Sequence, residues 1–200
     1  MRTEPMRQDR GVPGDDFGGR GLPGLPGHNR RSGAGGRNWR KPVRVELASG
    51  ERPFDGYLHC DERRLPATNL VCRVECLPFA SGSVESLLAS HIIEHFSYRT
   101  VGEVLDEWYR ALKPGGDVLI ITPNFAYVAH GYTEGWMDHK EARDRMFGGQ
   151  DYEGNYHYNM YDYSSLQRAL EETGFKNVRD VTSNYESRKV PMSIYFNAEK

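Results

Sequence analysis

The sequence predicts an α/β domain built on a mostly parallel sheet. Short β-branched segments alternate with amphipathic segments along residues 43–200, as in chains whose strands are joined by helices. The segment DVLIITPN, residues 117–124, is a continuous apolar run, which is typical of a parallel strand covered on both faces. The 200 residues, 38% of them hydrophobic, suit a single folded domain.

Five strands are expected in the first part of this domain. Their ranges are 43–47, 56–61, 70–75, 84–90 and 117–124. About nine residues join the first strand to the second, and a similar number join the second to the third. A parallel crossover normally needs a dozen or more residues. Either these connections are tight irregular loops without helices, or the strand order differs from the expected one.

Two helices and two more strands complete the predicted domain. The first helix begins at a capping box formed by Thr100 and Glu103 and stops before Lys113. Its apolar positions recur at helical spacing: Val101, Leu105, Trp108 and Leu112. The second helix runs from Ser164 to Gly174. The closing strands are expected at 176–182 and 192–198.

Residues 1–42 differ in composition from the rest and are predicted to be a disordered tail. They are rich in Gly, Pro and Arg and carry nine Lys or Arg against four Asp or Glu, whereas the remainder is acidic. Such a segment has too little apolar surface to fold. Arginine-rich segments also bind RNA, but a solvated tail is the favoured interpretation. The folded domain is therefore assigned to residues 43–200.

Composition also bears on the cellular setting. The sequence shows no apolar run near the ~18 residues that cross a bilayer, and its N-terminus lacks the apolar region of a secretory signal. The cysteines, Cys60, Cys72 and Cys76, lack Cys-x-x-Cys spacing, which favours reduced thiols. We expect a cytoplasmic protein with no membrane partner.

The segment HIIEH, residues 91–95, has the His-x-x-Glu-His spacing found in some zinc proteases. Here it follows the fourth predicted strand, and the sequence offers no convincing third zinc ligand. The favoured interpretation is that Glu94 and His95 cap or hydrogen-bond the start of a helix. No metal site is therefore predicted.

Several motifs occur together and in order along residues 43–200: VELASG, YLHCD, LPF, SHIIEH, LKPGG and TPN. In this combination the chain resembles the class I S-adenosylmethionine-dependent methyltransferases, especially a group of small bacterial type 11-like members. The resemblance implies a Rossmann-like sheet, mostly parallel, with an antiparallel C-terminal strand and shortened crossovers in its first half. It also implies that S-adenosyl-L-methionine is the cofactor.

The resemblance places the cofactor past the carboxyl ends of the strands. Glu46 matches the acid that helps hold the methionine end, Gly50 the middle glycine of the following turn, and Asp61 the acid that binds the ribose hydroxyls. Glu75 stands in for an acid near the adenine, where Arg73 replaces the usual aspartate. The full predicted cofactor set is Glu46, Ala48, Ser49, Gly50, Asp61, Glu75, Ser90 and His91.

Two of the three family glycines in this turn are replaced, by Ala48 and Arg52. Ala48 adds a methyl group where the backbone approaches the cofactor. The alternative prediction is therefore a catalytically inactive methyltransferase-like binding module. Some relatives with a similar Glu-His element bind a divalent cation, which leaves Mg²⁺ at Glu94 and His95 as a minor alternative.

The leading prediction is methyl transfer to an oxygen or nitrogen atom of a small molecule or glycan. His91 and His157 are the predicted bases, ahead of His130 and His139. Residues of about 125–163 occupy the place where class I methyltransferases commonly insert an acceptor cap. The predicted acceptor-binding residues in it are Trp136, Tyr156, His157 and Tyr158. The acidic folded part shows no RNA-binding motif, which argues against nucleic acid, and the oligomeric state is not defined.

Overall fold

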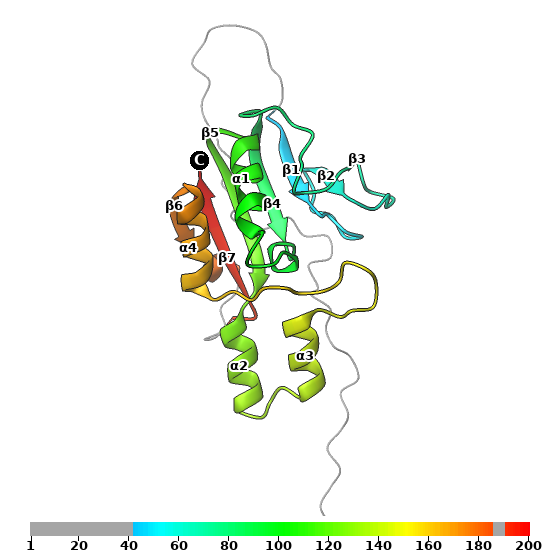
Figure 1. Ribbon diagram of the computed structural model, residues 1–200, viewed down its shortest axis with the longest axis vertical. Coiled ribbons are helices and arrows are strands. Elements are labelled where there is room, and N and C mark those ends of the chain that lie inside the picture. The colour runs from blue at the N-terminus through cyan, green and yellow to red at the C-terminus, as the bar shows by residue number, and fades with distance from the viewer. Residues whose placement is uncertain (1–41, 186–190) are drawn as a thin grey trace, which may run out of the picture.

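The computed structural model describes residues 42–185 and 191–200. The predicted tail therefore lies outside the described residues, apart from Pro42. The elements of Figure 1 are β1 (Arg44–Leu47), β2 (Leu58–Asp61), β3 (Leu70–Val71), β4 (Val84–Ser90), η1 (Ile93–His95), α1 (Val101–Ala111), β5 (Leu112–Pro123), α2 (Phe125–Thr133), α3 (His139–Phe147), α4 (Tyr163–Thr173), β6 (Lys176–Asp180), η2 (Thr182–Asn184) and β7 (Ser193–Glu199).

The strands form one seven-stranded sheet in the order β3-β2-β1-β4-β5-β7-β6. Strands β1 to β5 pair in parallel, whereas β7 is antiparallel to both β5 and β6. The chain runs outward from β1 to β3 and returns to place β4 on the other side of β1. The prediction of a mostly parallel sheet with an antiparallel C-terminal strand is confirmed, and a topological switch point lies between β1 and β4.

The short connections in the first half of the sheet are irregular loops. Residues 48–57 join β1 to β2 and residues 62–69 join β2 to β3, with no helix in either loop. The predicted shortened crossovers are therefore present. The third strand, Leu70–Val71, is shorter than the predicted 70–75. The last hydrogen bond to β2 is donated by Cys72 N–H to the Asp61 carbonyl at 3.1 Å, and beyond Cys72 the chain leaves the sheet.

Helices α1 and α4 lie side by side over one face of the sheet (Figure 1). Their apolar faces pack on inward side chains of the strands, among them Leu87 and Ile120. The predicted α1 capping box is wrong: the Thr100 hydroxyl donates to the Ser97 carbonyl instead of capping the helix. Helix α4 begins one residue earlier than predicted, where the Asp162 carboxylate accepts from Ser165 N–H at 2.8 Å.

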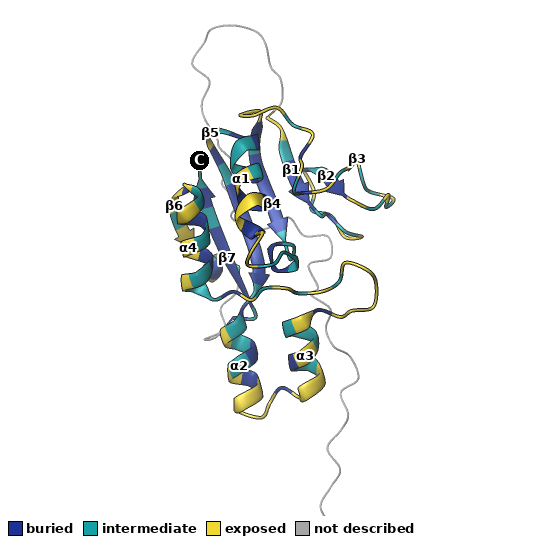
Figure 2. Ribbon diagram, viewed as in Figure 1, coloured by how far each residue is buried: buried dark blue, intermediate teal, exposed yellow. Residues whose placement is uncertain are grey.

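The opposite face of the sheet carries a second apolar cluster, formed by Tyr57, Leu88, Leu119, Ile121 and Tyr195. Flanking side chains come from loops and from the ends of η2, and no α-helix of the described ranges contributes to this cluster. Helices α2 and α3 form a hairpin beyond the carboxyl ends of the strands, and Figure 2 shows exposed, intermediate and buried residues on both helices. Among the described residues, none of the helices combines the length and apolar character that crossing a membrane requires.

Candidate active site

The predicted cofactor-binding residues meet at the carboxyl ends of β1, β2 and β4. Two cavities adjoin there, of about 520 Å³ and about 320 Å³. Of the predicted set, the larger cavity is lined by Ala48, Gly50, Asp61, Glu75 and His91. The smaller is lined by Glu46, Ala48, Ser49, Gly50 and Ser90. The turn after β1 borders both, so one elongated ligand can extend past this turn from one cavity to the other.

The turn after β1 leaves room for a ligand against its backbone. Gly50 has a φ of 62°, and a Cβ atom added there would meet nothing within 4 Å. The Ser49 hydroxyl is buried and finds no hydrogen-bond partner among the described residues. Because buried polar groups are normally paired, this hydroxyl fits a site that a polar ligand completes. The turn therefore fits close approach by a cofactor.

Asp61 ends β2 as a buried, ionised carboxylate. Its Oδ2 accepts from Gly50 N–H at 2.9 Å, and its Oδ1 accepts from Arg63 N–H at 2.9 Å and from Arg63 Nε at 3.1 Å. Burial opposes ionisation, but the hydrogen bonds from Arg63 and Gly50 outweigh it and hold the pKa of Asp61 below its usual value. A ligand hydroxyl that binds Asp61 must therefore compete with the Arg63 guanidinium.

Glu46 lies beneath the turn and is only 2% exposed. Its Oε2 accepts from Phe54 N–H at 2.9 Å and lies 2.9 Å from His59 Nδ1. Burial raises the pKa of Glu46 to about 8, against the lowering effect of the Phe54 N–H. Burial also lowers the pKa of His59. At pH 7 the two side chains thus form a hydrogen-bonded pair that is mainly neutral, and no ion pair.

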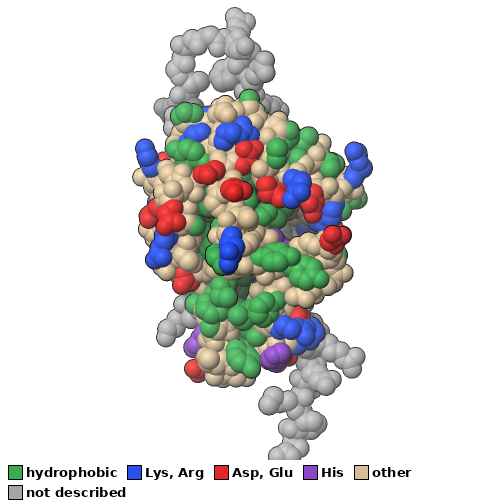
Figure 3. Space-filling view, viewed as in Figure 1, with side chains coloured by type: hydrophobic (Ala, Val, Ile, Leu, Met, Phe, Trp, Pro, Cys, Tyr) green, Lys and Arg blue, Asp and Glu red, His purple; other side chains and the backbone are tan. Residues whose placement is uncertain are grey.

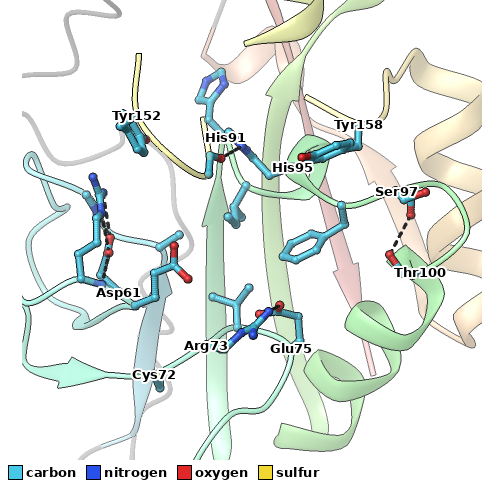
Figure 4. A pocket seen from close by; sticks show the side chains of 18 residues that line it. Asp61, Cys72, Arg73, Glu75, His91, His95, Ser97, Thr100, Tyr152 and Tyr158 are labelled. Atoms are coloured by element: carbon cyan, nitrogen blue, oxygen red, sulfur yellow. Dashed lines mark hydrogen bonds and ion pairs between the residues drawn. The ribbon is translucent and has the colours of Figure 1, made fainter. Parts of the chain in front are cut away.

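Aromatic and histidine side chains form one side of the larger cavity. Tyr152, His91, His95 and Tyr158 follow one another along its upper rim in Figure 4, across from Glu75. Tyr152 and Tyr158 belong to the segment between α3 and α4, which was predicted as part of the acceptor cap. This segment therefore reaches back to the cofactor side of the molecule.

His91 directly follows β4 with a φ of 52°. Its Nδ1 lies 3.4 Å from Oε1 of Glu94, which is only 1% exposed, and its Nε2 is shielded from solvent. The other oxygen of Glu94 accepts from the Thr122 hydroxyl at 3.0 Å. Burial opposes ionisation of Glu94, but His91 and two further histidines hold its pKa below the usual value. A buried carboxylate is therefore placed to orient the His91 ring.

The four predicted acceptor-binding residues do not share one cavity. Tyr158 lines the larger cavity, and Tyr156 stacks on it with ring centroids 6.3 Å apart. His157 lines a separate small cavity together with Glu94. Trp136 lies on the α2–α3 hairpin, where it contacts the Tyr127 ring, and does not line the cavity that Tyr158 lines. Only Tyr158 thus faces the predicted cofactor site.

Sequence reasoning missed several side chains of the site. Arg63 bonds the Asp61 carboxylate, and its guanidinium carbon lies 5.2 Å from the centroid of the Tyr152 ring. The Glu46 partner His59 was missed as well. The only available signal for Arg63 was its position two residues after the acid that ends β2.

The backbone conformation of Ala48 is expected to strain the turn after β1. It has a φ of 50°, a left-handed conformation that costs a non-glycine residue about 1–2 kcal/mol. Replacement by glycine removes this strain, but it also raises the conformational entropy of the unfolded chain, which offsets part of the gain. Ala48→Gly is therefore expected to stabilise the fold by a net amount of roughly 0.5–1 kcal/mol. Urea unfolding measures the difference. Ala169→Gly within α4 is the control and should destabilise, and a destabilised Ala48→Gly would contradict the prediction.

Comparisons with known proteins identify the fold and the family. The sequence has no significant match among curated proteins. The fold is similar to an S-adenosylmethionine-dependent methyltransferase of Thermotoga maritima described as a possible histamine N-methyltransferase, at 14% identity and a TM-score of 0.55 over 81% of this chain and 84% of that one. A comparable enzyme of Archaeoglobus fulgidus has 14% identity and a TM-score of 0.53, over 80% and 86% of the two chains.

A further similar structure is the 1,6-didemethyltoxoflavin-N1-methyltransferase of Burkholderia thailandensis with bound S-adenosylhomocysteine. It has 14% identity and a TM-score of 0.52 over 80% of this chain and 72% of that one. At these identities the structures establish the shared fold. A family model described as a methyltransferase domain matches residues 33–180. The chain therefore belongs to the methyltransferase domain family, and it is an S-adenosylmethionine-dependent methyltransferase.

Proposed function

We propose that this enzyme methylates an oxygen or nitrogen atom of a small polar molecule, sugars included. The observation that carries the proposal is the arrangement of the larger cavity. Predicted cofactor residues such as Asp61 and Glu75 line the lower part of this cavity in Figure 4, and Tyr152 and Tyr158 of the segment after α3 line its upper rim. An acceptor held against these tyrosines lies next to the cofactor.

The residues at the strand ends fit the cofactor. We assign the ribose hydroxyls to Asp61, the methionine ammonium group to Glu46, and close backbone approach to Ala48–Gly50. The bound cofactor supplies a sulfonium whose methyl group is electrophilic. The protein then has to exclude water and hold the acceptor in line with that methyl group.

The size of the cavity favours a small acceptor. At about 520 Å³ it lies within the range of small-ligand sites, roughly 300–1,000 Å³, and it must also hold part of the cofactor. Two enzymes of similar fold support this class, since one is a 1,6-didemethyltoxoflavin N1-methyltransferase and the other is a possible histamine N-methyltransferase. Hydrophobic side chains gather on the lower half of the face in Figure 3, where the segment after α3 and the α2–α3 hairpin lie. Exposed aromatic side chains in that segment suit stacking with a ring-shaped acceptor.

We assign the role of base to His91. It borders the larger cavity, and the buried Glu94 carboxylate orients its ring and stabilises the charged imidazolium. In the free enzyme Nε2 is shielded from solvent, so local movement must open this nitrogen to the acceptor while Nδ1 stays beside Glu94.

Methyl transfer to a panel of small amines, phenols and sugars tests the proposal, with S-adenosylhomocysteine formation as the readout. For a hydroxyl acceptor, His91→Ala is expected to lower kcat by roughly 100-fold or more and to remove the rise of kcat with pH. His139→Ala, an exposed histidine at the start of α3, is the matched control and should keep wild-type kcat. If His91→Ala keeps wild-type kcat on a hydroxyl acceptor, the base assignment is wrong. If the cofactor binds but no panel member is methylated, the small-molecule proposal fails.

The neutral state of Glu46 predicts proton release on cofactor binding. Its pKa of about 8 means that the carboxyl is mostly protonated at pH 7, whereas an adjacent ammonium group favours the ionised form. Binding of S-adenosylhomocysteine at pH 7 should thus release close to one proton, and affinity should rise as the pH approaches about 8. Calorimetry in two buffers of different ionisation enthalpy measures the release. Glu46→Gln should abolish it, and wild-type binding without proton release would exclude the assignment.

A further inference from the structure

Glu94, His95 and His157 meet at one point, although His157 is distant from the other two in sequence. One potential ligand atom from each residue lies within 4.8 Å of the others. Glu94 and His95 belong to η1, after β4, whereas His157 lies between α3 and α4. We propose that these three side chains bind one divalent transition-metal ion, with Zn²⁺ the best match, and that the ion fastens the segment after α3 to the active site.

Both histidines are prepared to bind a metal through Nε2. Nδ1 of His95 lies 2.9 Å from the Gly154 carbonyl oxygen, and Nδ1 of His157 lies 3.1 Å from that of Arg145. A carbonyl oxygen only accepts hydrogen bonds, so each Nδ1 carries the proton and each Nε2 carries the lone pair. Metal-ligating histidines are held in this way, by a hydrogen bond from the second ring nitrogen to a backbone carbonyl or a carboxylate.

Glu94 supplies a buried anionic oxygen. Its Oε2 accepts from the Thr122 hydroxyl, whereas Oε1 makes no geometric hydrogen bond within the described ranges and lies 3.4 Å from His91 Nδ1. A carboxylate oxygen has two lone pairs, so Oε1 can bind an ion and still lie beside His91. Arg145 lines the small cavity beside Glu94 but pairs with Glu141, at 3.0 Å. Because a buried carboxylate needs a cation or donors, a metal ion at Oε1 completes the environment of Glu94.

The donor set points to a particular class of ion. Two imidazole nitrogens and one carboxylate oxygen suit Zn²⁺, Fe²⁺ or Mn²⁺, whereas Mg²⁺ prefers an all-oxygen environment. This distinguishes the site from one that binds Mg²⁺ at Glu94 and His95 alone. The adjoining cavity, lined by Glu94 and His157, measures about 20 Å³. That is room for roughly one water molecule to complete the coordination.

The ion would reinforce contacts that already join the two segments. The backbone N–H groups of Tyr158 and Asn159 donate to the Glu94 carbonyl at 2.9 and 3.2 Å, and the His95 ring is bonded to the Gly154 carbonyl. Tyr158 lines the larger cavity directly beyond this junction. A metal at the junction therefore fixes the aromatic side of the cavity. The metal site itself does not depend on which acceptor is methylated.

Metal content and thermal unfolding of the full chain test the proposal. Protein stripped with a chelator and reloaded with Zn²⁺ should retain about one ion per chain after gel filtration, and its Tm should rise. His157→Ala and His95→Ala should each lose the stoichiometric ion and the rise in Tm, whereas the exposed His139→Ala should keep both. Folded wild-type protein that retains no Zn²⁺, or His157→Ala that retains the full amount, would overturn the proposal.

Two further measurements use only the wild-type chain, so their outcome does not depend on whether the variants fold. Zn²⁺ should protect His95 and His157 from diethyl pyrocarbonate, as read by mass spectrometry, while His139 stays reactive. Co²⁺ bound in place of Zn²⁺ should show visible d–d bands without a thiolate charge-transfer band in the near ultraviolet. A thiolate band would place the metal on cysteine and reject the site, as would equal labelling of His157 with and without Zn²⁺.

Discussion

Asp61→Ala is expected to weaken binding of S-adenosylmethionine by roughly 10²- to 10⁴-fold. The ionised carboxylate offers two oxygens at the end of β2, and each hydrogen bond from a ribose hydroxyl to a charged acceptor contributes about 1.5–3 kcal/mol. Alanine removes both acceptors and leaves the Gly50 N–H and the Arg63 guanidinium without their partner. Calorimetric titration with S-adenosylhomocysteine measures the change, and circular dichroism verifies the fold.

Two neighbouring variants sharpen this experiment. Arg64→Ala removes an exposed charge near Asp61 that lines neither cavity and should leave the Kd within about twofold, because exposed charges are largely screened. Arg63→Ala should tighten binding several-fold, since the guanidinium competes with the ribose hydroxyls for the Asp61 carboxylate. A Kd that Asp61→Ala leaves unchanged would exclude Asp61 from the cofactor site. Weaker binding by Arg63→Ala would show that Arg63 supports the cofactor.

The sheet was largely predictable because each strand carries its own local signal. The apolar runs of β4 and β5 gave strand ranges that overlap the observed ones, and the short connections led to the expected loops. The third strand was predicted too long for a physical reason. Val74 is apolar because the loop after β3 is buried against α1, not because it extends the strand. Local apolarity cannot distinguish these two causes.

The candidate site was predictable where a residue ends a strand and not where two distant segments meet. The resemblance placed Asp61 and Gly50 at or just past strand ends, and both line the larger cavity. The contact between His157 and His95, with ring centroids 4.9 Å apart, joins segments that no periodic pattern connects. Arg63 was missed because nothing in the local sequence indicates whether a surface arginine folds back on its neighbour. Such contacts depend on tertiary packing.

Trp108→Ala is expected to destabilise the fold by about 3–5 kcal/mol, a large part of the ~5–15 kcal/mol that holds a domain together. The Trp108 side chain is completely buried on α1, and its Nε1 donates to the Val74 carbonyl at 3.0 Å. The loop after β3 has no helix or strand of its own, and α1 side chains supply several of its hydrogen bonds. Arg110 likewise donates to the Leu77 and Phe79 carbonyls, at 3.2 and 2.8 Å.

Urea unfolding followed by far-ultraviolet circular dichroism measures this loss without relying on tryptophan fluorescence. Trp108→Phe retains most of the buried ring but leaves the Val74 carbonyl unpaired, so it should cost about 1–3 kcal/mol. Trp136→Ala is the matched control on the α2–α3 hairpin; with a side chain that is 49% exposed it should cost about 1 kcal/mol or less. If Trp108→Ala lowers the free energy of unfolding by no more than the small amount expected for Trp136→Ala, the loop after β3 is held by contacts other than Trp108. Because this loop also supplies Glu75 to the larger cavity, Trp108→Phe should in addition weaken cofactor binding if Trp108 positions the loop.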